Sequence, residues 1–169
     1  MPIYIKKSAG LDKVLKGSPI IGDIRADFNK QGPNTFRKAL LSDMNKSISP
    51  VKGQGKWVRY SASYIKQINN FLGAAWGKQI TPVNLKLSGE LHNSLKVFGV
   101  GLLSKTYVLR VQFNDFLADI HNRRGASKKK VIRRLLPTIN GEEFNYGLTQ
   151  VLLKSLKDSV ARIVAKYNA

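Results

Sequence analysis

The first half of the chain carries apolar residues at helical spacing. The segment Gly32–Thr35 can start a helix, with Asn34 or Thr35 as its cap. The apolar positions behind it recur every three or four residues: Phe36, Ala39, Leu40 and Met44. This helix should end near Ser47, because a residue that precedes a proline, as Ser49 does, disfavours the αR region. The pattern therefore predicts one helix between two turn-forming segments.

Shorter elements are expected on either side of that helix. Residues 2–6 are compatible with a strand, and residues 11–16 with one or two helical turns that end at Gly17. Residues 48–60 are interrupted by Gly and Pro and predict a loop, and residues 61–76 predict a second helix.

The second half of the chain changes from helical spacing to alternation. Apolar and polar residues alternate over 83–87, 94–98 and 107–113, which indicates strands with one buried face. From Phe144 to Tyr167 the period returns to that of a helix. The apolar positions of this last segment are Leu148, Leu152, Leu156, Val160, Ile163 and Tyr167.

Together these elements predict an α+β fold, with helices packed on a small antiparallel β-sheet and a long C-terminal helix. We expect a single domain over residues 1–169, in which 1–48 form an N-terminal arm and helix and 49–169 form the core.

Charge is the strongest feature of the composition. The chain has 29 Lys and Arg against 10 Asp and Glu, a formal net charge of +19. Such a surface favours polyanions through counterion release, although basic residues can also only solvate a surface or meet acidic neighbours in an assembly. The chain has no Cys, which excludes disulfides and thiolate sites, and its apolar runs are shorter than the roughly 18 residues that suggest a membrane span.

Candidate catalytic groups are few. Asp119, His121 and Arg123 would share one face of a strand and could serve a nuclease, but further metal ligands are missing around them. The alternative is that His121 and Asn122 bind backbone groups at a turn. Glu142 and Glu143 could bind a metal, but they also suit the start of the following helix, where acids complement the helix dipole. We therefore expect no enzyme activity, no cofactor and no metal.

Two segments combine the features of a contact surface. Residues 122–134 hold seven basic residues and no acidic one, which is typical of an exposed loop. The candidates there for contact with DNA or a partner are Arg123, Arg124, Lys128, Lys129, Lys130, Arg133 and Arg134. In residues 48–60 aromatic and basic side chains alternate, which suits stacking on single strands or a protein interface. The interface candidates there are Lys52, Lys56, Trp57, Arg59 and Tyr60.

Three parts of the sequence resemble a known family. They are the loop Ser49–Ser61, the segment Pro82–Leu95, and a third block made of Ile120–Asn122, Arg133–Thr138 and Gly141–Phe144. In this order, and followed by a closing helix, they resemble the motifs of phage neck and tail-completion (virion-morphogenesis) proteins. The loop 123–134 of this chain is longer and more basic than is usual there, and residues 1–48 carry no motif of that family.

The resemblance implies a structural protein of a tailed bacteriophage, made in the host bacterial cytoplasm and located in the neck or tail of the virion. Proteins of this kind form a homo-oligomeric ring, a hexamer or dodecamer, between portal or adaptor proteins and tail proteins. Genomic DNA passes through the lumen, and no membrane is involved. The alternative that the charge leaves open is a basic, non-enzymatic nucleic-acid-binding protein.

Overall fold

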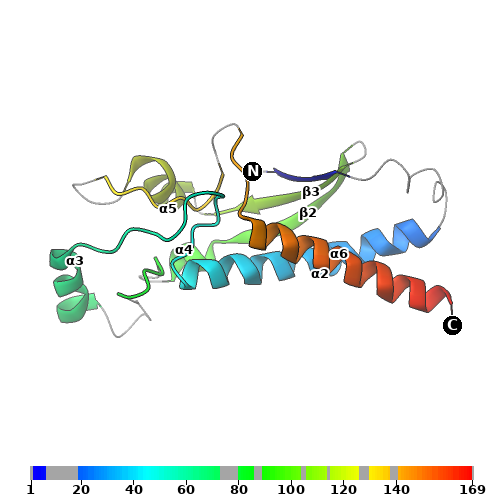
Figure 1. Cartoon of the computed structure of the whole chain (residues 1–169), viewed down its shortest axis with the longest axis horizontal. Helices are drawn as coiled ribbons and strands as arrows, with labels where there is room; N and C mark the ends of the chain where they lie inside the picture. The colour runs from blue at the N-terminus through cyan, green and yellow to red at the C-terminus, as the bar shows by residue number, and fades with distance from the viewer. Residues whose placement is uncertain are drawn as a thin grey trace.

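A computed structural model describes residues 2–6, 19–72, 80–85, 89–103, 106–113, 115–125, 130–137 and 141–168 (Figure 1). Its strands are β1 (Pro2–Lys6), β2 (Lys96–Leu103) and β3 (Thr106–Gln112). Its α-helices are α2 (Pro19–Asn45), α3 (Ala62–Gln67), α4 (Glu90–Asn93), α5 (Asp115–Asp119) and α6 (Tyr146–Tyr167). Two π-helical turns, η1 (Ile68–Leu72) and η2 (Ile120–Arg124), continue α3 and α5. The predicted α+β class with a long C-terminal helix is confirmed.

The sheet is antiparallel, with strand order β1-β3-β2. Both outer strands pair with β3: Pro2 of β1 lies opposite Arg110, and Val97 of β2 lies opposite Val111. A bulge in β2 lies between Gly99 and Gly101. The strands expected at 2–6 and 107–113 are present, and the segment 94–98 enters β2 at Lys96.

The strand expected at 83–87 is wrong over its described part. Residues 83–85 form a turn and a loop, and Leu85 has a positive φ of 53°. Val83, Asn84 and Leu85 are all buried, so the alternation of their polarity does not reflect two faces of a sheet. The backbone carbonyl oxygen of Asn84 lies 2.8 Å from Nε2 of the buried His92, which ties this loop to α4. Residues 86 and 87 lie outside the described part.

Helix α2 begins fourteen residues earlier than Pro33, so the prediction of a helix start at Gly32–Thr35 is wrong. Pro33 lies inside the helix, where it cannot donate to the preceding turn. Thr35 donates its hydroxyl to the carbonyl of Gln31 and caps nothing. The buried ring of Phe28 explains the glycine, because a Cβ on Gly32 would lie 2.8 Å from Cε2 of that ring. Tertiary packing here overrides the local preference of Gly32 and Pro33 for a helix boundary.

Helices α2 and α6 lie side by side along the long axis of the molecule, with the sheet beside α2 (Figure 1). Asn145 caps α6 by accepting a hydrogen bond of 2.9 Å from the amide of Leu148. The side of α6 that is buried consists of Leu148, Leu152, Ser155 and Ser159. The sequence placed Val160 and Tyr167 on the core face, but they are 37% and 44% exposed. After Leu152 the fully buried positions of α6 are the small residues Ser155 and Ser159, and Leu156 is partly buried against the core.

Other predicted elements have mixed outcomes. The loop at 48–60 is confirmed, and the helix expected at 61–76 is present as α3 and η1 from Ala62 to Leu72, with Ser61 as its cap. The helical turns expected at 11–16 lie outside the described residues, as do residues 73–76, the end of the helix predicted at 61–76. None of the helices in the described ranges combines the length and the apolar character that crossing a bilayer would need.

Candidate functional site

The loop at 48–60 and the segment that precedes α6 form one hydrogen-bonded unit. The carbonyl of Arg134 accepts from the hydroxyl of Ser49 at 3.0 Å and from the indole Nε1 of Trp57 at 3.2 Å. Val51 forms a β-bridge with Phe144, and the amide of Asn145 donates to the carbonyl of Pro50 at 2.7 Å. Two segments that are more than 70 residues apart in the sequence are thus tied together at several points.

Arg133 is buried in this unit and is only 4% exposed. Its Nε and Nη2 atoms donate to the carbonyl of Val58 at 3.2 and 3.0 Å. Its guanidinium carbon lies 5.0 Å from the centre of the Tyr60 ring, a distance typical of a cation–π contact. The guanidinium therefore holds the loop at 58–60 and is not available to an external phosphate.

Arg134 is also buried, at 8% exposure, and forms an ion pair with Glu142. Its Nη1 atom donates to the carbonyl of Asn122 at 3.2 Å. The amide oxygen Oδ1 of Asn122 in turn accepts from the amides of Leu135 at 2.7 Å and Leu136 at 3.0 Å. The expectation that Asn122 binds backbone groups is confirmed, and it does so across a long loop.

These contacts correct four of the predicted contact residues. Arg133, Arg134, Trp57 and Tyr60 were expected on exposed loops, but all four are buried inside the subunit. The physical reason is that Trp57 and Arg133 each donate to a backbone carbonyl of the opposite loop, so two loops that look independent in the sequence form one packed unit. They are therefore no longer candidates for contact with DNA or a partner.

The remaining candidates differ in how free their charges are. Arg123 and Arg124 are exposed, and both bind the carboxylate of Asp119, with Nε of Arg123 at 2.6 Å. Lys52 is exposed and lies 2.6 Å from Glu143. Lys56, Arg59 and Lys130 are exposed and form no ion pair with any described residue. Lys128 and Lys129 lie outside the described residues.

The nuclease and metal-site readings depended on particular arrangements of side chains, which the described residues do not adopt. Asp119, His121 and Arg123 lie in α5 and η2 and not on a strand, and the carboxylate of Asp119 is ion-paired with Arg123. Glu142 and Glu143 each form an ion pair with a basic residue, and this, more than the helix dipole, explains their position. Within the described ranges, no group of three or more potential metal ligands comes together.

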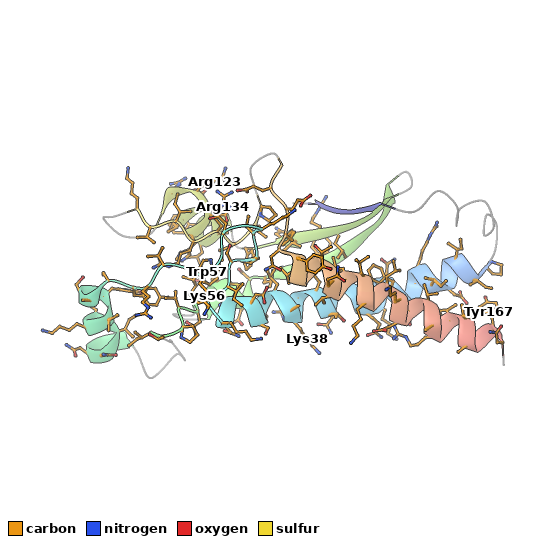
Figure 2. All side chains as sticks on the ribbon, in the orientation of Figure 1. Lys38, Lys56, Trp57, Arg123, Arg134 and Tyr167 are labelled. Atoms are coloured by element: carbon orange, nitrogen blue, oxygen red, sulfur yellow. The ribbon has the colours of Figure 1, made fainter. Side chains whose placement is uncertain are left out.

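The ion pairs show where the positive charge is left without a counter-charge. Six cations among the described residues share five carboxylates: Asp23, Asp27, Asp119, Glu142 and Glu143. The chain has ten carboxylates in all, so at least half of them are already engaged within the subunit. Lys38 and Lys56, labelled in Figure 2, are exposed and form no such pair in the described structure.

The chain matches no family model, no curated protein and no solved structure. Function must therefore be argued from its own residues.

A second surface feature lies on α6. Leu153, Val160, Val164 and Tyr167 are between 37% and 44% exposed, and spacings of seven, four and three residues place them on one side of the helix. We call these four residues the α6 stripe. It runs toward the end of the molecule at which Tyr167 is labelled, far from Arg123 and Trp57 (Figure 2). Exposed apolar residues that gather on one side of a helix are typical of a protein contact surface.

The burial of Tyr60 gives a prediction for pH. Burial raises the pKa of Tyr60 to about 12 from an ordinary value of 10.0, against the opposing charge of Arg133. Above pH 10 the unfolded chain therefore loses this proton while the folded chain keeps it. The free energy of unfolding should then fall by about 1.4 kcal/mol per pH unit up to about pH 12, relative to Tyr60→Phe.

Denaturant unfolding at a series of alkaline pH values measures this difference. Tyr146→Phe is the matched control, because it removes the same hydroxyl from a side chain that is 74% exposed. If wild type and Tyr60→Phe lose stability in parallel above pH 10, the phenol of Tyr60 is not shielded as described.

Proposed function

We propose that this protein is a structural subunit of a tailed-phage particle, a neck or tail-completion protein that acts by assembling into a ring around the DNA passage. The observation that carries the proposal is the hydrogen-bonded unit described above. It joins Ser49–Ser61 to Asn122, Arg133–Arg134 and Gly141–Phe144, which are residues on which the family resemblance rests. The residues of separate motifs thus belong to one folded structure, as expected if the motifs specify a fold together.

The surface supports an assembling role. A subunit with net charge +19, at least half of whose carboxylates are paired internally, requires anionic surroundings at high local density. The α6 stripe and the basic residues around Arg123 lie toward different ends of the elongated molecule, where contacts with different neighbours are possible (Figure 2). A head-to-tail contact that uses two different surfaces closes into a ring when the rotation between subunits allows it.

The test is the mass and shape of the purified protein, by light scattering and electron microscopy at moderate salt, with and without DNA. Closed rings of uniform size without DNA would support the connector proposal. A particle that stays monomeric at all concentrations and associates only on DNA would instead support the second candidate, a non-enzymatic nucleic-acid-binding protein. That candidate is favoured by the exposed cations that have no ion pair, such as Lys38 and Lys56.

A variant of the α6 stripe makes the test specific. Val160→Lys places a charge in the middle of the stripe and should shift the mass toward monomer, because an ammonium group would be buried without a partner between subunits. Ala161→Lys is the control, since it adds the same charge at the next position, which is exposed on another side of α6. Equal masses for the two variants would mean that the stripe takes no part in assembly.

A further inference from the structure

The sheet has one buried face and one open face. Leu109 and Val111 of β3 are buried, and Val97 of β2 packs against the same core. The residues between them point the other way, and Lys96, Phe98, Arg110 and Gln112 are all exposed. The register places Phe98 directly opposite Arg110, and Lys96 directly opposite Gln112. These four residues form a contiguous patch, which we call the open sheet face.

The chemistry of this patch is unusual for a surface that only meets water. Phe98 exposes 39% of its surface on the β2–β3 strand pair, and an exposed phenyl ring lowers the solubility of a protein. The guanidinium carbon of Arg110 lies 5.9 Å from the centre of that ring, at the outer limit of a cation–π contact. Lys96 and Arg110 form no ion pair with any described residue. An aromatic ring is therefore flanked by two cations that form no ion pair within the described part of the chain.

We infer that the open sheet face binds single-stranded nucleic acid, with a base stacked beside Phe98 and Arg110 and with Lys96 and Arg110 on the adjacent phosphates. Base stacking on an aromatic side chain of an exposed sheet, with cations along the backbone path, is a general solution for unpaired strands. Duplex DNA keeps its bases stacked inside and would gain nothing from the ring of Phe98. An acidic protein would satisfy the cations but does not require a stacking ring between them. This inference goes beyond the ring proposal and does not depend on it.

The experiment measures the binding of a fluorescent oligothymidylate of about 12 nucleotides by anisotropy, with a duplex of equal length beside it. Phe98→Leu keeps an apolar side chain and removes the ring, and it should weaken binding to the single strand by about 5- to 150-fold. Binding of the duplex should not change. Phe116→Leu, at an exposed phenylalanine of α5, is the control and should leave both affinities as in wild type.

The charges are tested through the salt dependence. Lys96→Gln should lower the slope of log affinity against log salt by about 0.7 for the single strand, which is the loss of one phosphate contact. Lys157→Gln removes an exposed charge from α6 and should leave the slope unchanged. If Phe98→Leu binds the oligothymidylate as tightly as wild type, or if Lys157→Gln and Lys96→Gln lower the slope equally, binding is diffuse electrostatics and the inference is overturned.

Discussion

Replacing Glu142 by alanine should lower the free energy of unfolding by about 3 kcal/mol. The side chains of Arg134 and Glu142 are only 9% and 19% exposed, and the guanidinium cannot give up its proton. The variant therefore leaves a buried charge without its carboxylate. Urea unfolding followed by circular dichroism measures the loss, which should appear as a lower midpoint with an unchanged slope.

The neighbouring residue provides a matched control. Glu143 forms an ion pair with Lys52, but the two side chains are 66% and 67% exposed, so Glu143→Ala should cost less than about 1 kcal/mol. Replacing Arg134 and Glu142 together by Met and Leu should recover most of the stability, because no uncompensated charge remains. Equal losses for Glu142→Ala and Glu143→Ala would contradict the role given to the Arg134–Glu142 pair.

This prediction bears on how a loss of function is interpreted. The sequence alone presents Glu142 and Glu143 as two equivalent carboxylates, and a failed Glu142 variant could be taken as a sign of metal binding or catalysis. The structure separates them by burial. A Glu142 variant that fails to assemble should therefore first be compared with wild type in stability.

Periodicity predicted the parts of the fold that depend on neighbours in the sequence. The closing helix is found at Tyr146–Tyr167, and its cap at Asn145 uses a residue only three positions from the amide that it accepts. Strand β3 follows from its alternation in the same way, whereas the predicted segment 94–98 covers only the start of β2. Helix α2 is an exception, since Gly32 and Pro33 locally indicate a helix start that the burial of Phe28 and Pro33 overrides.

The contact candidates were less predictable, because exposure depends on partners that are distant in the sequence. Arg133 and Arg124 belong to the same basic run, but only Arg133 meets the carbonyl of Val58, 75 residues away. One local signal does separate them. Arg133 and Arg134 lie between Val131-Ile132 and Leu135-Leu136, and a basic pair with apolar residues on both sides indicates a packed segment better than a free loop does.

Asn122 carries the second large expected effect. Its Oδ1 atom accepts from the amides of both Leu135 and Leu136, and its side chain is buried. Asn122→Ala removes both acceptor contacts, and each buried amide without a partner costs about 1–3 kcal/mol. The free energy of unfolding should therefore fall by about 2–5 kcal/mol, measured by urea unfolding. Asn34→Ala, at an exposed position of α2, should change it by less than about 0.5 kcal/mol.

A conservative variant distinguishes the lost acceptor from the lost volume. Asn122→Asp keeps an oxygen at the position that receives the two amides and should retain more of the stability than Asn122→Ala. If aspartate and alanine are equally destabilising, packing volume and not hydrogen bonding is what position 122 supplies. If neither differs from Asn34→Ala, the segment at Leu135–Leu136 is held by Arg134 and Trp57 alone. If Asn122→Ala is more destabilising than Asn122→Asp, and both more than Asn34→Ala, then Asn122 holds the two ends of the basic loop together. The loop could then vary in length and charge while its two ends stay in place.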